Sequence, residues 1–286
     1  MRRRFALHAA SAGMLSLLEI IEVAAAVGFD AIEIDDEHLE RHLATGGTLR
    51  DARLALSRAG IEPLSLRSRS SILPTSVDEL APIERRYEAL CARGAAIACS
   101  MIVVQPTLLI NGNSVELCRD TTSRMLNALG TLAEQCEVRV ALELVGLAPS
   151  SIRTLNAART VLADARLSSL KLVIDAFDFY AGSSTWGMLD EIAPDALAIV
   201  RLTDCAERPF NELSDRDREL AGDGVLPLRD FLRRVERLGY RGPYSIEVRR
   251  PEHSRWPPNQ FARAALESIA AICAEADEQD GVLDYA

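Results

Sequence analysis

The chain has 286 residues, of which 48% are hydrophobic and 26% charged, so it is long enough to bury one large core. Its formal net charge of −10 argues against a nucleic-acid partner, because polyanions are bound chiefly by basic side chains. The sequence has no apolar run near the ~20 residues of a membrane span, and its six cysteines lack the paired spacing of a zinc site or disulfide framework. We therefore expect a cytoplasmic protein with reduced thiols.

Short apolar segments alternate with segments of helical periodicity along the whole chain. The predicted strands are Phe5–His8, Ala31–Ile34, Ile61–Leu66, Met101–Val104, Arg139–Leu144, Leu170–Ile174, Leu197–Leu202 and Tyr244–Val248. The predicted helices are Leu15–Val27, Leu49–Ala59, Asp78–Arg93, Ser114 to about Cys136, Thr154–Ala163, Met188–Ile192, Pro227–Leu238 and Gln260–Ala276. Arg2–Arg4 and the apolar run behind it imitate a signal peptide, but that run supplies the first strand and helix, so we assign it to the domain.

Eight strands that alternate with helices predict a parallel sheet with right-handed crossovers. At this length, the number of strands favours closure into a single-domain (β/α)₈ TIM barrel that spans residues 1–286. A doubly wound open sheet is the alternative.

Four of the later predicted strands carry a charged residue at or next to their carboxyl end: Glu143, Asp175, Arg201 and Glu247. The carboxyl ends of barrel strands meet at one mouth, which is the active face of such proteins. A structural ion-pair cluster is the alternative, but buried charges without compensation cost several kcal/mol each, so the convergence favours a functional site. Three carboxylates in one pocket also require a cation.

Other residues are weaker candidates. The ends of the four earlier strands could line the same pocket: His8, Glu33, Arg67 and Gln105. Three histidines fall in predicted loops and are expected at the surface: His38, His42 and His253. Three aromatic residues could wall the pocket or pack against a partner subunit: Tyr180, Trp186 and Trp256.

Six stretches, spread over nearly the whole chain, resemble the xylose isomerase-like barrels and, within them, the inosose (2-keto-myo-inositol) isomerases of inositol catabolism. They are Ala31–Ile34, Val140–Gly146, Leu172–Phe177, Leu213–Arg218, Ala221–Gly224 and Ser245–Glu252. The resemblance implies an enzyme that isomerises or epimerises a small polyol, keto-inositol or ketose.

In that family, a divalent metal (Mn²⁺, Mg²⁺ or Zn²⁺) is held by four residues after strands five to eight. The resemblance implies Glu143, Asp175 and Glu247 as ligands here, whereas Arg201 stands where the family has a histidine. Arginine stays protonated and offers no lone pair, so we expect weak metal binding and no tight zinc. Asp178 replaces a second family histidine, and we expect Arg201 to pair with Asp178 or with the former ligands.

The family mechanism implies that the metal polarises a ketose carbonyl and hydroxyl while Glu143 and Glu247 take and return a proton across a cis-enediolate. Without a metal, we expect Arg201 to supply the positive charge that stabilises the enediolate. The expected substrate contacts are His8, Gln105 and Asp178, together with Arg218 and Arg250, which match family positions at the active face. Two alternatives stay open: a dehydratase of a dehydroshikimate-like substrate, and a metal-free carbohydrate-binding protein without catalysis. The related endonuclease IV is excluded by the acidic charge and the four histidines. The expected partner is a small polyol or ketose, and the protein is a monomer or a homo-oligomer.

Overall fold

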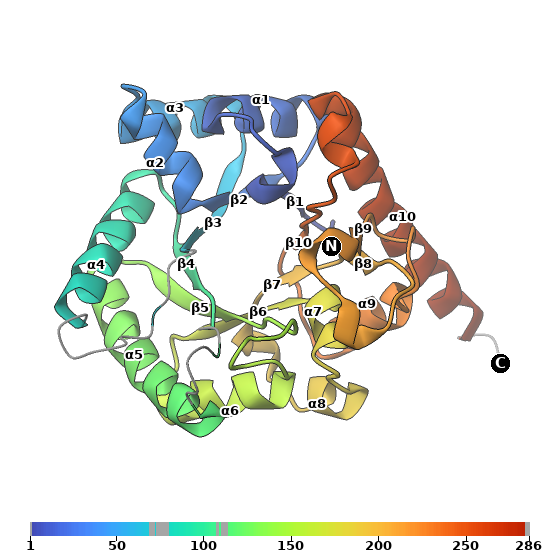
Figure 1. The fold of residues 1–286 in the computed structure, drawn as a ribbon. Helices are drawn as coiled ribbons and strands as arrows, with labels where there is room; N and C mark the ends of the chain where they lie inside the picture. Colours follow the sequence, from blue (N-terminus) through green and yellow to red (C-terminus); the bar gives the residue numbers. More distant parts are fainter. Residues whose placement is uncertain (1, 69–71, 73–79, 107–108, 110–113, 284–286) are drawn as a thin grey trace.

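The eight long strands close into a parallel barrel, surrounded by helices (Figure 1). The computed structural model describes residues 2–68, 72, 80–106, 109 and 114–283. Around the barrel the strands follow the order β1, β10, β7, β6, β5, β4, β3, β2, and every neighbouring pair with a recorded register is parallel. The predicted (β/α)₈ barrel is therefore confirmed, and the open doubly wound sheet is excluded.

The barrel strands lie close to the predicted segments. They are β1 (Phe5–His8), β2 (Ala31–Asp35), β3 (Glu62–Ser68), β4 (Met101–Val104), β5 (Arg139–Glu143), β6 (Lys171–Asp175), β7 (Leu197–Arg201) and β10 (Tyr244–Ile246). Two short strands, β8 (Asp204–Cys205) and β9 (Arg218–Glu219), pair antiparallel in the segment between β7 and β10. This small sheet was not predicted, and it carries Arg218 to the mouth of the barrel.

The helices form the outer layer of the molecule (Figure 1). They are α1 (Leu17–Val27), α2 (Asp36–Ala44), α3 (Leu49–Ala59), α4 (Leu80–Ala96), α5 (Val115–Gln135), α6 (Leu155–Ala165), α7 (Ala176–Ala181), α8 (Trp186–Asp190), α9 (Leu228–Arg237) and α10 (Pro258–Leu283). The expected start of the third helix at Asp78 lies outside the described residues. Local signals set several bounds: Ser16 and Glu19 form a capping box at α1, and Gly28 ends that helix at a left-handed φ of 105°.

Helices α2 and α7 were not predicted, because each begins directly after a strand, with no turn residues between. The carboxylate of Asp175, the last residue of β6, accepts a hydrogen bond from Phe177 N at 2.9 Å and so caps α7. The expectation that His38 and His42 are surface residues is wrong: they are 5% and 9% exposed on the inner side of α2.

The apolar core has two main parts, beside a third, small cluster of Phe177, Ala181 and Cys205. A small cluster of inward-facing residues fills the barrel, and a larger one lies between the strands and the helices. Side chains two positions apart on a strand point the same way, so inward-facing Ala141, Val173 and Ile199 predict that the residues two positions later also point inward. Those residues are Glu143, Asp175 and Arg201. In the described part of the chain, no helix is long and apolar enough to cross a membrane.

Candidate active site

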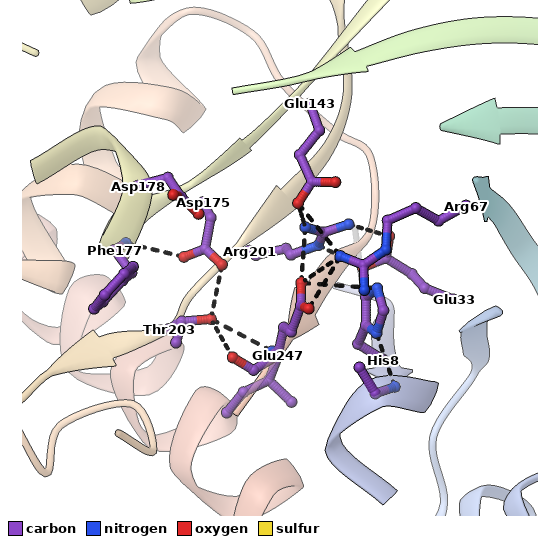
Figure 2. Close-up of polar contacts among 12 residues, drawn as sticks. His8, Glu33, Arg67, Glu143, Asp175, Phe177, Asp178, Arg201, Thr203 and Glu247 are labelled. Atoms are coloured by element: carbon purple, nitrogen blue, oxygen red, sulfur yellow. Dashed lines mark hydrogen bonds and ion pairs between the residues drawn. The ribbon is translucent and has the colours of Figure 1, made fainter. Parts of the chain in front are cut away.

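The carboxyl ends of the strands bring a set of charged side chains together in the mouth of the barrel (Figure 2). Each is at most 1% exposed: His8, Glu33, Asp35, Arg67, Glu143, Asp175, Arg201 and Glu247. They come from seven of the eight barrel strands or from the residue that follows one. Charges buried this deeply persist only when paired, so the pairing decides what the site can do.

Arg201, at the end of β7, contacts three carboxylates. Its Nε and Nη2 each donate to a different oxygen of Glu33, both at 2.8 Å. Its Nη1 lies 2.5 Å from Glu143 Oε1 and 3.0 Å from Glu247 Oε2. Burial opposes the charge of Arg201, but these carboxylates outweigh burial and raise its pKa well above the usual value. Arg201 thus pairs with two of the expected metal ligands; the alternative pairing with Asp178 is wrong.

Arg67, in β3, is a second buried cation in contact with the same glutamates. Its Nε donates to Asp35 Oδ1 at 2.7 Å, and its Nη1 lies 3.0 and 3.1 Å from the two oxygens of Glu247. The same nitrogen is 3.5 Å from Glu143 Oε1. The sequence indicated Arg67 only as a lining residue and did not single out Asp35. Their strand-end positions were the available signal.

Arg218, in β9, holds the two aspartates on the other side of the site. Its guanidinium group donates to Asp175 Oδ2 at 2.7 Å and to Asp178 Oδ2 at 2.6 Å, and it lies over the ring of Phe177 at 4.2 Å. Thr203 Oγ1 also donates to Asp175, at 3.0 Å. The predicted ligand Asp175 therefore belongs to a different ion-pair group from Glu143 and Glu247.

Burial and neighbouring charges act differently on these acids. Burial raises the pKa of Asp175 to about 7, although Arg218 opposes the rise. Burial likewise raises the pKa of Asp178, against Arg218. For Glu247 burial is outweighed by the nearby Arg67 and other cations, and its pKa falls well below the usual range. Glu247 is therefore an ionised carboxylate at neutral pH.

A few buried polar atoms in this cluster have no hydrogen-bond partner among the described residues. They are Glu143 Oε2, Arg67 Nη2 and His8 Nε2. His8 Nδ1 accepts a hydrogen bond from Ala10 N at 3.0 Å, which places the proton of a neutral ring on Nε2. Burial and Arg67 lower the pKa of His8 to about 4, so the ring is neutral at pH 7. An acceptor oxygen and two N–H donors are thus left to contact a ligand.

The remaining candidates lie further out. Gln105 follows β4 at the same end of the barrel and is half-buried. Arg250 pairs with Glu219 and Glu252 and lines a separate hollow of about 280 Å³. The aromatic candidates pack elsewhere: Tyr180 and Trp186 contact Phe179, and Trp256 contacts His253, which in turn contacts Phe261.

The residues expected to bind a divalent metal do not fit one. Glu143 Oε1 and Glu247 Oε2 both meet a nitrogen of Arg201, and Asp175 is engaged by Arg218 and Thr203. No group of three or more His, Cys, Asp or Glu side chains within the described residues is arranged to hold a metal ion.

Gly146 provides a test of the aspartate side of the site. Its N–H donates to Asp178 Oδ1 at 2.8 Å, and a Cβ at this position would lie 2.0 Å from the backbone oxygen of Asp178. We expect Gly146→Ala to lower the free energy of unfolding by about 3 kcal/mol or more, because backbone atoms must move apart. Urea unfolding measures the loss, and Gly187→Ala is the control.

At Gly187, the nearest atom to an added Cβ is Thr185 Oγ1 at 3.9 Å, so alanine fits there without movement. We expect the Gly187→Ala protein to be as stable as the wild type or slightly more stable, because alanine favours the helix. Equal stability of the two variants would show that the close contact between position 146 and the backbone of Asp178 does not affect the free energy of unfolding.

Comparisons with known proteins agree with this architecture. A family model described as "Xylose isomerase-like TIM barrel" matches residues 21–272. Proteins named inosose isomerase from Bacillus velezensis and Halalkalibacterium halodurans are each 23% identical, over 90% of this chain and 92% and 91% of their own lengths. A crystal structure of the IolI protein "with a binding zinc atom" superimposes with a TM-score of 0.89 at 20% identity, and the match covers 96% of this chain and 99% of that one. At that identity the likeness to the solved structure shows the fold alone.

Proposed function

Because the chain belongs to the xylose isomerase-like TIM barrel family, we propose that it isomerises or epimerises a small ketose, polyol or keto-inositol. The relatives named inosose isomerase support this class of substrate. One observation carries the proposal: Glu143 keeps a buried oxygen that has no partner among the described residues, beside two buried guanidinium groups. A base next to fixed positive charge is what proton transfer through an enediolate requires.

The proposed reaction begins with proton removal by Glu143. Its Oε2 takes the proton from the carbon next to the substrate carbonyl, and the C–H electron pair becomes the new C=C bond. The carbonyl π electrons move onto oxygen, so an enediolate forms. The N–H of Arg67 Nη2, which has no partner in the described part of the chain, is available to donate to this oxygen. The hydroxyl proton on the first carbon moves to the former carbonyl oxygen, and the other oxygen then re-forms a C=O bond. The C=C electron pair takes the proton back from protonated Glu143 at the former carbonyl carbon, which completes an isomerisation and restores the carboxylate.

Glu247 receives a narrower role than the family mechanism implies. Arg67, Arg201 and Arg249 engage its two oxygens, and its pKa lies well below the usual range. A carboxylate held in this way is a weak base. We propose that Glu247 positions the arginines and balances their charge, and that Glu143 moves the proton.

Solvent exchange tests the proposed function across the whole class of substrates at once. The wild-type protein is incubated in D₂O with a panel of ketoses and keto-inositols, and NMR follows deuterium at the carbon next to the carbonyl. We expect incorporation into at least one compound. A compound that raises the melting temperature but takes up no deuterium would favour a non-catalytic carbohydrate-binding protein instead.

The binding-only alternative has one observation in its favour, because both oxygens of Glu247 are already engaged by arginines. A dehydratase would give a different result from an isomerase or a binding protein. It would release water from a hydroxylated substrate and form a C=C bond conjugated with a carbonyl, which ultraviolet absorbance detects. The same panel, with dehydroshikimate added, therefore separates all three functions.

A further inference from the structure

Arg201 occupies the point at which two of the expected metal ligands converge. Its Nη1 lies 2.5 Å from Glu143 Oε1 and 3.0 Å from Glu247 Oε2, and the whole side chain is buried (Figure 2). We propose that this guanidinium group is a built-in replacement for a divalent cation, and that the native protein neither binds nor needs a metal ion at this site.

The ligands that remain are too few for a metal. Mg²⁺ and Ca²⁺ take six or more oxygen ligands within about 2.6 Å, and waters can supply only part of them. Both oxygens of Glu247 are held by arginines, and Asp175 is held by Arg218. Within the described residues, Glu143 Oε2 is the one buried carboxylate oxygen of the cluster without a partner. One such oxygen beside a permanent positive charge does not hold a divalent ion.

Glu33 prevents the arginine from moving aside for a metal. Two parallel hydrogen bonds of 2.8 Å join its oxygens to Nε and Nη2 of Arg201, which is the strongest geometry for such a pair. Ser65 Oγ donates to Glu33 as well, at 3.1 Å, and so fixes the carboxylate. The alternative partner, Asp178, is already engaged by Arg218. Arg201 is therefore held in place from the side opposite to the two glutamates.

This inference rests on the proposed function where it concerns catalysis. A metal ion in such a site would stabilise the negative charge of an enediolate. Here Arg201 and Arg67 bring two permanent positive charges to the same glutamates, and Arg67 Nη2 has no acceptor among the residues that the structure describes. The two arginines thus supply the positive charge, without a metal ion that a chelator could remove.

Metal binding by the full-length protein tests the inference. The protein is purified without chelator, and its metal content is measured by mass spectrometry. Equilibrium dialysis against Mn²⁺ and Zn²⁺ follows. We expect far less than one ion per chain in both measurements, and the same melting temperature before and after dialysis against EDTA. One ion per chain that EDTA removes, with a fall in melting temperature, would overturn the inference.

A double variant shows whether Arg201 is the cause. Arg201→His supplies a ligand nitrogen, and Glu33→Gln removes the carboxylate that would otherwise lose its partner. We expect this protein to bind more Mn²⁺ or Zn²⁺ than the wild type, since Glu143 loses its arginine and a histidine is a common ligand of such ions, although Arg67 and Arg249 still engage Glu247. Arg139→His, at the exposed start of β5, is the matched control and should gain nothing.

The outcomes for metal and for activity are separable. If the double variant does not fold, the wild-type measurements still decide the question. A metal-free wild type that shows no deuterium exchange would refute the proposed isomerase and leave the metal inference standing. Exchange that EDTA abolishes would refute the metal inference and leave the isomerase standing.

Discussion

Replacement of Arg201 by leucine is expected to lower the free energy of unfolding by about 3–5 kcal/mol, the usual cost of removing one partner of a buried ion pair. The variant leaves Glu33 without either of its arginine hydrogen bonds; Glu143 loses one hydrogen bond and Glu247 one ion pair. All three side chains are at most 2% exposed, so water does not replace the lost partner. Urea unfolding at neutral pH measures the loss.

Two controls show that the loss comes from buried charge. Arg93→Leu removes an arginine whose side chain and partner Glu40 are 30% and 57% exposed, and we expect a change below about 1 kcal/mol. Adding Glu33→Leu to Arg201→Leu removes both members of the tightest pair and should recover part of the stability. A loss no larger than that of Arg93→Leu would mean that the buried cluster does not stabilise the fold.

The substitution Glu143→Gln is expected to slow deuterium exchange into any active substrate by about 10²–10⁴-fold, the usual contribution of a general base. The amide has the same shape, and its oxygen can still accept the hydrogen bond that Arg201 Nη1 donates to Oε1. It cannot accept a proton from carbon. NMR exchange rates in D₂O give the effect, and circular dichroism verifies that the variant is folded.

Glu62→Gln is the matched control, because Glu62 lies at the start of β3, at the opposite end of the barrel, and its side chain is 49% exposed. We expect this variant to exchange at the wild-type rate. Exchange in Glu143→Gln at the rate of Glu62→Gln would remove Glu143 from the mechanism.

Sequence patterns predicted the barrel because its signals are local. Each strand is a short apolar run, and glycines such as Gly28 and Gly60 end the helices between them. The same runs also predicted which charges reach the mouth, since Glu143 and Arg201 follow inward-facing residues by two positions. Helix α7 was not predicted, because it begins at the residue directly after β6 and its apolar residues follow those of the strand. Periodicity therefore does not separate the helix from the strand.

The pairing of the charges could not be predicted from spacing. Glu33 and Arg201 are 168 residues apart, and nothing local marks one as the partner of the other. The sequence therefore left Arg201 with two options and did not include Glu33 in either. Arg218 was expected to contact substrate, but its partners Asp175 and Asp178 depend on a two-stranded sheet of four residues that gave no signal.

The arginine pairs also bear on how the barrel folds. Arg67 and Glu247 are separated by 180 residues, and Arg201 lies 168 residues from Glu33, so each bond joins the first half of the chain to the second. A half-barrel of the first four strands would keep Arg67 with Asp35 but would leave Glu33 in an apolar interior without its arginine partner, which is unfavourable. Intermediates with only one half formed are therefore disfavoured, and the two halves should unfold in a single cooperative transition. Separately produced halves should gain structure only when mixed.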